Sequence, residues 1–507
     1  MERKRKKSEQ SSYILKENNE LDFNFRDLLR ENCGLAAAIN LENASWIAGQ
    51  MITLIEKRGE KGGGVVSQQE GNIYGRRRVG PFSVQFRDYN EIRFSHELPG
   101  DMAIAHCRYA TKGDPGLVAN IQPLIVTDSK YGPFAIAHNG TLVNADTQKE
   151  ELKQRGCKFD STSDTEILIH LILTSGEERI QDAIYCALNK ITCAYSLLII
   201  TKDKIFVIRD CYGVRPLSIA TLGRGFLVCS ETVAFDQFRG AEYVRDVEPG
   251  EMIIFEKKAE IFTKDHNIYA AAKECYCIFE SIYFSNPRSK YKGVYNEDFR
   301  KNIGKKIAAV NQGLKGDLVV PILDSGKHFA QGLAHVLCTR LNVHYGDLYE
   351  EVFQRAHEPL GGQSRSFTAT TTEERILVIR KKLHLKREAV VSKEIIVVDD
   401  SIVRSHTAKI IVEMLREAGA KKVIFCVCFP PIISICPNGM DFQTCEQLIA
   451  YKRSLKFIKN KIGADELIYL QVAELYEVVT ETYGLNCGIC AGCVGGAYPE
   501  IPKCILK

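Results

Sequence analysis

The residues IIVVDDSIVRSHT, at positions 395–407, constrain the fold of this chain more than any other stretch. Their apolar, β-branched run is too short for a helix and predicts a strand that is buried on both faces. Residues 407–422 then repeat apolar side chains on one helical face and stop at Gly419, and residues 423–429 are strand-like again. The stretch therefore predicts a β-α-β unit of a parallel sheet.

Two adjacent carboxylates, Asp399 and Asp400, end the first of these strands. Ligands of parallel sheets bind beyond the carboxyl ends of the strands, and like charges there indicate either a divalent metal or a sugar diol. The loop Ser401–Thr407 leads into a helix N-terminus, whose free N–H groups favour phosphate. Together these features suggest a phosphorylated ribose. The simpler alternative is an acidic turn after an ordinary strand.

The length and composition of the chain exclude several classes of protein. A chain of 507 residues predicts two domains rather than one. Its net charge of +4 gives no electrostatic argument for binding nucleic acid or an acidic membrane. No apolar run reaches the ~20 residues of a membrane span or has the pattern of a secretory signal. The 18 cysteines are scattered, so we expect mostly free thiols in a cytoplasmic protein.

The two halves of the chain differ in their expected secondary structure. A polar tail, expected to be disordered, precedes a β-rich half that runs from Cys33 to about residue 265. Strands in this half are expected at 102–111, 134–144, 194–201, 204–210, 225–231 and near 245–256, and helices at 164–176 and 180–191. From about residue 275 a β-α-β rhythm follows, with expected elements at 296–312, 316–323 and 327–340.

Residues that could bind and cleave glutamine stand at the ends of the predicted strands and at a helix start: Cys33, Arg108, Asn139, Gly140 and Asp164. A cation would hold the substrate carboxylate, an acid would hold its ammonium group, and an amide with a backbone N–H would stabilise an oxyanion. Cys33 would form a thioester and release ammonia. No histidine partner is evident, so the base would be the α-amino group of Cys33 after removal of residues 1–32. Taken alone, Asn139-Gly140 also fits a hairpin turn, and Arg108 and Asp164 fit exposed charges.

Ordered motifs in each half resemble known domains. The segments CGL, KRG (57–59), HCRYAT, NIQPL, HNGTLVN and STSDTEIL resemble the class II glutamine amidotransferase domain of the N-terminal-nucleophile fold. In the second half, VVDDSIVR resembles the ribose-phosphate loop of type I phosphoribosyltransferases. Residues 319–334 resemble their pyrophosphate loop, and residues 365–383 resemble the flexible loop that closes over the substrate.

In this order, the two site sets resemble the glutamine phosphoribosylpyrophosphate amidotransferase family, over residues 33 to about 499. The resemblance implies an αββα glutaminase domain at 33–270 and a doubly wound α/β phosphoribosyltransferase domain at 271–460. These would follow a tail and propeptide at 1–32 and precede a C-terminal segment at 461–507. The overall class would be α/β and α+β.

The resemblance also implies a reaction and the residues that serve it. Ammonia from glutamine would pass internally and displace pyrophosphate from phosphoribosyl pyrophosphate, which gives 5-phosphoribosylamine in the first step of de novo purine (IMP) synthesis. Mg²⁺ would be held by Ser325, Asp399 and Asp400, since hard oxygen ligands suit it. Further substrate contacts are implied for Asp324, Gly326, Ser401, Arg404 and Thr407. Purine nucleotides would be feedback inhibitors, and the protein would be a homotetramer.

The segment CGICAGC (487–493) contains two overlapping Cys-x-x-Cys steps, which suit an iron–sulfur cluster or zinc. One branch of the family carries a [4Fe–4S] cluster, and its pattern matches Cys277, Cys436, Cys490 and Cys493. Cys487 is surplus to that pattern. Zinc or unligated thiols are the alternatives, and a cluster would be structural because nothing in the reaction needs an electron.

Several positions depart from the family pattern. The phosphate loop, usually Arg-Gly-Thr-Thr, is Arg404-Ser405-His406-Thr407 here, and Thr370 and Thr372 replace Pro and Gln in the flexible loop. Segments 57–64 and 283–289 also differ. The replacement by Ser405 and His406 favours an alternative hypothesis, a regulatory or structural paralogue that keeps the fold but turns over poorly. A third hypothesis, an amidotransferase that makes amino sugars or asparagine, leaves VVDDSIVR unexplained.

Overall fold

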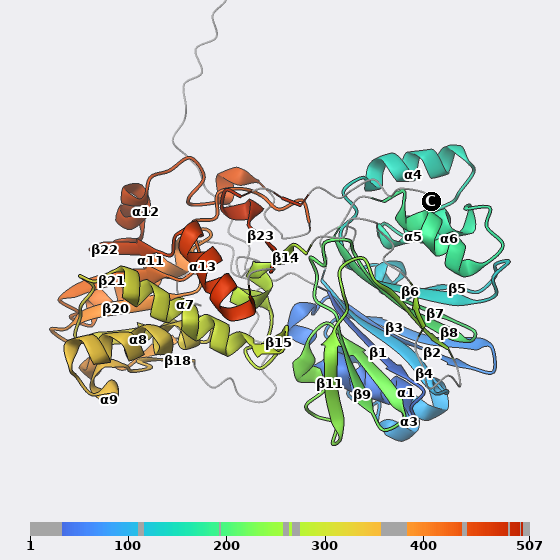
Figure 1. Ribbon diagram of the computed structural model, residues 1–507, viewed down its shortest axis with the longest axis horizontal. Coiled ribbons are helices and arrows are strands. Elements are labelled where there is room, and N and C mark those ends of the chain that lie inside the picture. Colours follow the sequence, from blue (N-terminus) through green and yellow to red (C-terminus); the bar gives the residue numbers. More distant parts are fainter. Residues whose placement is uncertain are drawn as a thin grey trace, which may run out of the picture.

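The protein consists of two α/β bodies joined by short irregular elements. A computed structural model describes residues 33–109, 116–191, 194–256, 263–265, 274–355, 383–438, 444–484, 487–496 and 498–499. The expected propeptide and residues 365–382 of the expected flexible loop, with Thr370 and Thr372, lie outside the described residues. Figure 1 shows the N-terminal body, blue to green, beside the C-terminal body, yellow to red.

Two antiparallel sheets form the N-terminal body. The first has the order β11-β9-β10-β1-β4-β2-β3 and the second the order β13-β12-β8-β7-β6-β5. The strands of the first are β1 (Gly34–Ile39), β2 (Gly62–Gln69), β3 (Asn72–Val79), β4 (Met102–Arg108), β9 (Ser218–Leu222), β10 (Gly225–Cys229) and β11 (Ala241–Asp246). Those of the second are β5 (Leu124–Val126), β6 (Phe134–Gly140), β7 (Tyr195–Thr201), β8 (Lys204–Arg209), β12 (Met252–Glu256) and β13 (Thr263–Asp265).

The two sheets face each other across an apolar core, and helices cover their outer faces. In β1, Leu35 and Ala37 pack toward the second sheet, whereas Ala36 and Ala38 pack with the outer helices, as the period of two of a strand requires. The first sheet is covered by α1 (Ala44–Leu54), α2 (Phe82–Gln85) and α3 (Glu91–Glu97). The second is covered by α4 (Ala145–Gln154), α5 (Thr165–Leu173) and α6 (Ile180–Leu188). The predicted αββα sandwich is confirmed.

The C-terminal body is built on a parallel sheet with the order β17-β20-β21-β22. Its strands are β17 (Leu318–Pro321), β20 (Glu394–Asp399), β21 (Lys422–Val427) and β22 (Glu466–Tyr469). The helices α7 (Asn296–Val310), α8 (Lys327–Leu341) and α13 (Val472–Tyr483) cover one face, and α11 (His406–Glu417) and α12 (Leu455–Ile462) cover the other. The β-α-β unit predicted from residues 395–429 and the doubly wound α/β fold implied by the resemblance are therefore confirmed.

Short elements join the two bodies or decorate them. At the junction, β14 (Tyr276–Cys277) pairs in parallel with β23 (Ile489–Cys490). The π-helical turn η5 (Glu280–Phe284) follows β14 in the chain, and the 3-10 turn η9 (Gly492–Val494) follows β23. The remaining strands and helix are β15 (Lys290–Tyr291), β16 (Val294–Tyr295), β18 (Phe353–Arg355), β19 (Leu383–Leu385) and α9 (Tyr345–Leu348). The single 3-10 turns are η2 (Glu56–Arg58), η3 (Val118–Asn120), η4 (Thr232–Ala234), η7 (Arg387–Ala389) and η8 (Cys445–Gln447).

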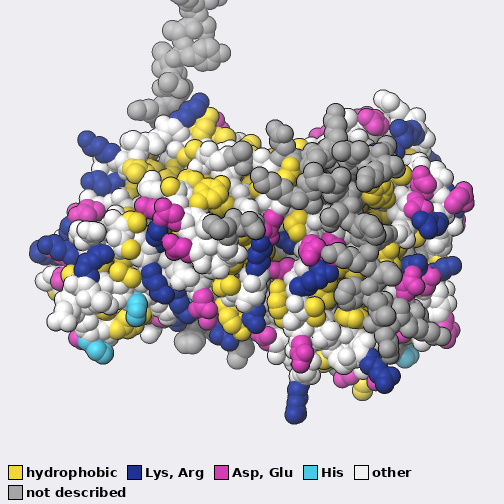
Figure 2. Space-filling model, viewed as in Figure 1, with side chains coloured by type: hydrophobic (Ala, Val, Ile, Leu, Met, Phe, Trp, Pro, Cys, Tyr) yellow, Lys and Arg dark blue, Asp and Glu magenta, His cyan; other side chains and the backbone are white. Residues whose placement is uncertain are grey.

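The length of the helices and the charges on the surface agree with what the composition of the chain predicts. Within the part of the chain that the structure describes, no helix is both long and apolar enough to cross a bilayer. Figure 2 shows Lys and Arg side chains interspersed with Asp and Glu on the face in view, in keeping with a net charge of only +4.

Candidate active sites

Cys33 stands directly before β1, beside the end of β4. The Cys33 thiol donates to the carbonyl oxygen of Tyr109, with 3.9 Å between sulfur and oxygen, so the sulfur lies next to the strand end that carries Arg108. The side chain of Arg108 is buried. Gly59 packs against the same strand end, where an added Cβ would come within 2.5 Å of the carbonyl carbon of Arg108. This contact explains the glycine of the KRG motif.

Asn139 and Gly140 end β6, in the facing sheet. His106 Nε2 lies 3.2 Å from the carbonyl oxygen of His138, which joins the ends of β4 and β6 across the sandwich. The Asn139 side chain is only 1 % exposed, and among the described residues its Nδ2 has no hydrogen-bond partner. A buried donor without an acceptor costs about 1–3 kcal/mol, so such a donor indicates a ligand atom at this position. An added Cβ on Gly140 would lie 2.3 Å from the carbonyl oxygen of Ala194.

Asp164 lies at the start of α5 and holds the loop that follows β6. Its Oδ2 accepts a hydrogen bond of 2.9 Å from the backbone N–H of Leu142. The structure therefore brings Asp164 to the same end of the sandwich as Asn139, Arg108 and Cys33.

A ring of buried polar residues, to which the sequence assigned no role, supports this end of the sandwich. Gln122 accepts from the backbone N–H of His138 at 2.6 Å and donates to the Thr165 hydroxyl at 3.0 Å. His138 Nδ1 lies 3.3 Å from the same hydroxyl. Burial lowers the pKa of His138 and lowers that of His106 to about 3, so both rings are neutral near pH 7. Gln122 lies in the NIQPL motif, but no pattern in the sequence predicts its contact with Thr165 of helix α5.

The acidic pair lies at the carboxyl end of β20. The side chains of Asp399 and Asp400 are 6 % and 3 % exposed. Asp399 Oδ1 accepts from the backbone N–H of Asp400 at 2.9 Å and from the Ser325 hydroxyl at 3.2 Å, and Asp400 Oδ2 accepts from the Ser401 hydroxyl at 2.6 Å. Burial raises the pKa of both acids, and the neighbouring carboxylate of Asp400 raises that of Asp399 further. Ionising both acids therefore requires a nearby cation.

The pyrophosphate loop that the sequence predicted lies between β17 and α8. Gly326 directly precedes α8, and an added Cβ there would lie 2.2 Å from the carbonyl oxygen of Val398, so a side chain cannot be accommodated. Asp324 is exposed two residues earlier, and Ser325 reaches Asp399 as described above. The structure thus places this loop directly against the end of β20.

The expected phosphate loop runs into the N-terminus of α11. Ser405 directly precedes the helix with φ 75° and ψ −12°, in the left-handed region that favours glycine. Thr407 is exposed in the first turn of α11. Arg404 donates from Nη2 to the side chain of Gln447 at 2.7 Å, so its guanidinium is directed toward η8.

Three chain segments bring the four predicted cysteine ligands together at the junction. Cys277 and Cys490 are directly opposite in the β14–β23 pair. The carbonyl oxygen of Cys493 accepts from the backbone N–H groups of Ile433 and Ser434, which draws the segment with Cys436 alongside. Burial raises the pKa of the Cys493 thiol, and the other three thiols raise it further. Within the described residues, however, no group of three or more His, Cys, Asp or Glu side chains has the arrangement of a metal site.

Comparisons with known proteins match both bodies. Residues 106–237 match the model of the glutamine amidotransferase domain, and residues 293–446 match that of the phosphoribosyl transferase domain. The amidophosphoribosyltransferase of Bacillus subtilis is 36% identical over 475 residues, which cover 93% of this chain and 94% of the relative. A chloroplastic amidophosphoribosyltransferase of Vigna aconitifolia is 33% identical, over 94% of this chain and 92% of the relative.

This chain belongs to the amidophosphoribosyltransferase family. The solved glutamine phosphoribosylpyrophosphate amidotransferase of B. subtilis, complexed with ADP and GMP, superposes with a TM-score of 0.82 at 36% identity, covering 92% of this chain and 97% of that one. A second structure, described as the allosteric regulatory enzyme of purine biosynthesis, gives a TM-score of 0.83 at 35% identity, over 93% and 97% of the two chains.

Membership in the family confirms the enzyme hypothesis. The amidophosphoribosyltransferase is a glutamine-dependent phosphoribosyltransferase, and its reaction is the first step of purine biosynthesis. The comparisons give no support to an impaired paralogue. The roles of single residues, the assignment to the iron–sulfur branch and the domain boundaries stay predictions.

Proposed function

We propose that Cys33 is the nucleophile that cleaves glutamine and that Asp399 and Asp400 bind the activated ribose. The observation that carries this proposal is the unsatisfied Asn139 amide at the end of the sandwich that also holds Cys33. Arg108 would hold the glutamine carboxylate and Asp164 its ammonium group. Removal of residues 1–32 would provide the α-amino group of Cys33 as the base.

Asn139 and Gly140 would stabilise the tetrahedral intermediate. The thiolate of Cys33 adds to the amide carbon of glutamine, and its charge moves to the carbonyl oxygen. That oxygen would accept from Asn139 Nδ2 and from the backbone N–H of Gly140. The α-amino group of Cys33, which took the proton of the thiol, returns that proton to the leaving nitrogen. Collapse then releases ammonia and leaves a glutamyl thioester, which water hydrolyses to glutamate and free Cys33.

The second half-reaction would take place at the end of β20. Asp399 and Asp400 would accept from the ribose hydroxyls, Asp324 and Gly326 would face the pyrophosphate, and the 5-phosphate would bind at the N-terminus of α11. Ser401, Arg404 and Thr407 would line that phosphate site. Ser325, Asp399 and Asp400 fit Mg²⁺ because they offer hard oxygen atoms, and substrate phosphates and water would complete the shell. When bound, Mg²⁺ would neutralise charge on the pyrophosphate.

Ammonia would pass between the two sites inside the protein. Aromatic side chains gather at the junction, where the Phe279 ring lies 5.0 Å from that of Phe429 and 5.3 Å from that of Phe284. Phe279 and Phe429 are buried. An apolar passage favours neutral ammonia over ammonium and keeps water from the activated sugar.

A [4Fe–4S] cluster held by Cys277, Cys436, Cys490 and Cys493 is proposed as a structural group. Its support is the convergence of these four thiols from three segments, and soft thiolates are the ligands that such clusters require. Iron and zinc analysis of protein purified without oxygen tests the proposal. About four iron atoms per chain are expected, and zinc in their place would contradict a cluster.

We also propose domain boundaries, inhibitors, an oligomeric state and a cellular location for the protein. Division into domains at 33–270, 271–460 and 461–507 is proposed. The boundary near residue 270 is supported by the change from antiparallel to parallel sheets. The boundary at residue 460 rests on the resemblance alone, because β22 of the last segment pairs with β21 in the same parallel sheet. Purine nucleotides as inhibitors are supported by the ADP and GMP bound to the B. subtilis enzyme. A homotetramer is proposed from the resemblance to the family. A cytoplasmic location is proposed because reducing conditions suit a site of four thiolates.

Two variants separate the half-reactions. Cys33→Ala should lose glutamine-dependent formation of phosphoribosylamine by more than about a thousandfold while the reaction with free ammonia continues. Asp399→Asn should lose both reactions, because both require bound phosphoribosyl pyrophosphate. Equal loss of both reactions in Cys33→Ala, with native circular dichroism, would contradict the assignment of Cys33.

A further inference from the structure

The buried side chain of Gln122 ties the end of β6 to the start of α5. Its Oε1 accepts from the backbone N–H of His138 at 2.6 Å, and its Nε2 donates to the Thr165 hydroxyl at 3.0 Å. A backbone N–H can only donate, so the amide oxygen must face His138, and the amide nitrogen is left to donate to Thr165. Gln122 therefore connects the residue before Asn139 with the residue after Asp164.

Asn120 makes a second tie on the other flank of Asp164. The buried Asn120 side chain donates to the Thr162 hydroxyl at 2.8 Å and accepts from the backbone N–H of Thr162 at 2.9 Å. Asp164 itself accepts from the backbone N–H of Leu142 at 2.9 Å, two residues beyond Gly140. Asp164 is thus fixed to the end of β6 directly and through both of its neighbouring segments.

The ring of His138 fills the space between these ties. Alternate residues of β6 pack against the outer helices and against the first sheet, so His138 points toward α5 and Asn139 toward the sheet that carries Cys33. His138 Nδ1 lies 3.3 Å from the Thr165 hydroxyl, and an added Cβ on Gly140 would lie 2.6 Å from His138 Nε2. The ring therefore connects the start of α5 to the backbone at Gly140.

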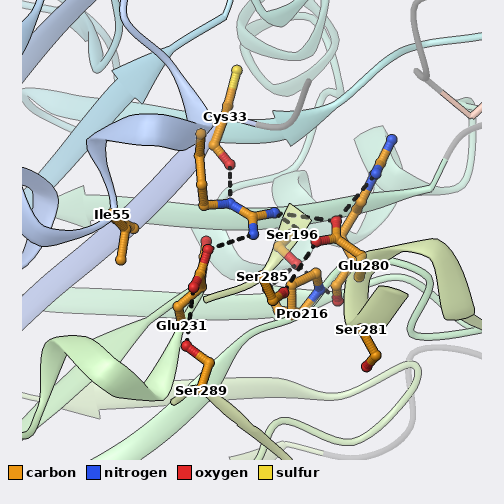
Figure 3. A network of polar contacts seen from close by, with 12 residues as sticks. Cys33, Ile55, Ser196, Pro216, Glu231, Glu280, Ser281, Ser285 and Ser289 are labelled. Carbon is orange, nitrogen blue, oxygen red and sulfur yellow. Dashed lines mark hydrogen bonds and ion pairs between the residues drawn. The ribbon is translucent and has the colours of Figure 1, made fainter. Parts of the chain in front are cut away.

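Cys33 is held by a different network. Arg58 donates from Nε to the backbone oxygen of Cys33 at 3.3 Å. Arg58 is held in turn by Glu231 at 2.9 Å and by both oxygens of Glu280 at 3.1 and 3.0 Å. Figure 3 shows the backbone oxygen of Cys33 facing this guanidinium, which the two carboxylates also contact. A change at Gln122 therefore leaves the support of Cys33 in place.

We propose that Gln122 is a positioning residue that sets the specificity for glutamine, because it fixes the separation between Asp164 and Asn139. Glutamine would span these two residues with two methylene groups between its α-carbon and its amide, whereas asparagine has only one. A rigid separation accepts one length of side chain, and a mismatch of one methylene is worth about 10–200-fold in kcat/KM. This inference rests on the proposed roles of Asp164 and Asn139.

The first experiment measures how the site distinguishes the two lengths. Diazo ketones with the carbon chains of glutamine and of asparagine are used to alkylate Cys33, and peptide mass spectrometry gives the rate of each. The wild type should prefer the glutamine analogue by at least about tenfold. Gln122→Leu is similar in size but loses both hydrogen bonds, so the preference should fall at least about threefold. Rates that fall equally for both analogues would show a merely structural role and overturn the inference.

A matched control is Gln68→Leu. Gln68 is also buried and donates to the backbone oxygen of Lys202, but it pairs with Met102, at the opposite end of β4 from Arg108. The preference for the glutamine analogue should not change in Gln68→Leu. The rate of phosphoribosylamine formation with free ammonia should stay within about twofold in both variants, which shows that each is folded. An equal loss of preference in Gln68→Leu would overturn the inference.

A pair of variants at Thr165 tests the same tie from its other end. Thr165→Val removes the hydroxyl that Gln122 and His138 contact and should reproduce the loss of preference, whereas Thr165→Ser keeps the hydroxyl and should retain the preference. Equal preferences in the two variants would overturn the inference. Failure of both analogues to label Cys33 in the wild type would instead contradict the proposed nucleophile, and this inference would fall with it.

Discussion

Ser405 occupies the position where the family carries glycine, and its backbone is left-handed, with φ 75°. In this region a residue with a Cβ raises the free energy of the folded state by about 1–2 kcal/mol relative to glycine. Part of this difference is offset, because glycine loses more conformational entropy on folding. The strain lies directly before the helix that is expected to bind the 5-phosphate. This substitution is therefore tolerated by the fold at an energetic cost.

Ser405→Gly should raise the free energy of unfolding by about 0.5–1 kcal/mol and lower the KM for phosphoribosyl pyrophosphate, because the backbone N–H groups reach the phosphate without strain. Chemical denaturation and steady-state kinetics measure the two effects. A higher KM in Ser405→Gly would mean that the Ser405 side chain itself contributes to binding.

Asp399 illustrates a conflict between stability and function. Asp399→Asn keeps an oxygen that can accept from Ser325 and Asp400 but removes one of two buried like charges. We expect the variant without ligands to be more stable by about 1–3 kcal/mol near pH 7. Its affinity for phosphoribosyl pyrophosphate with Mg²⁺ should fall by about 10–100-fold or more. Urea denaturation and calorimetric titration test both expectations, and a less stable variant would contradict the first.

The same residue predicts how stability depends on pH. The folded-state pKa of Asp399 is raised above the value of about 4 in an unfolded chain, so folded protein holds this proton more tightly. The resulting stability is complete below about pH 4 and is lost as the pH rises through the folded-state pKa. The difference in stability between Asp399→Asn and the wild type should therefore grow with pH across this range.

The sequence predicted the residues that carry recognisable chemistry but not those that hold them. Asp399 and Cys33 are recognisable because they stand at the ends of apolar strands. Arg58 and Glu280 are not, since they are 222 residues apart and only the folded chain brings them together. A buried ion pair of this kind has no local sequence pattern.

Among the elements, β20 and α11 agree closely with the sequence because periodicity and burial indicate the same structure. The predicted strand ended at the acidic pair, and β20 ends at Asp399. In contrast, the strand β2 begins with three glycines, which are typical of a loop. They are required by packing, since an added Cβ would lie 2.2 Å from Ile121 at Gly62 and 2.6 Å from the backbone of Gln122 at Gly64.

The contact between α7 and α8 depends on two reciprocal glycines. An added Cβ on Gly304 would lie 1.9 Å from the carbonyl oxygen of Phe329, and one on Gly332 would lie 1.9 Å from that of Lys301. Gly332→Ala should lower the free energy of unfolding by about 1–3 kcal/mol, even though alanine favours helix.

Thermal and urea denaturation of Gly332→Ala test this packing. The control is Gly313→Ala, because an added Cβ at Gly313 meets no atom within 4 Å. We expect that control to stay within about 0.5 kcal/mol of the wild type. Equal stability of Gly332→Ala and Gly313→Ala would show that the helices separate easily.

For the molecule as a whole, the order of the two site sets along the chain was the strongest signal of the family. The relative placement of the two bodies was not predictable. It rests on backbone hydrogen bonds from Cys275 and Cys277 to the loop that follows β8, at Tyr212 and Val214, and on the buried ion pair between Arg58 and Glu280. The glutamine-dependent activity therefore requires both bodies. The glutaminase site alone would lose its ammonia to water, and the phosphoribosyl site alone would have no ammonia from glutamine.

This chain makes phosphoribosylamine from glutamine by joining two reactions. The most direct test is pyrophosphate release from phosphoribosyl pyrophosphate and Mg²⁺, with protein purified without oxygen and with glutamine or free ammonia as the nitrogen source. We predict release with both donors, and loss of only the glutamine reaction in Cys33→Ala. Absence of pyrophosphate release with both donors, from folded protein loaded with its metal groups, would show that the chain does not catalyse this reaction.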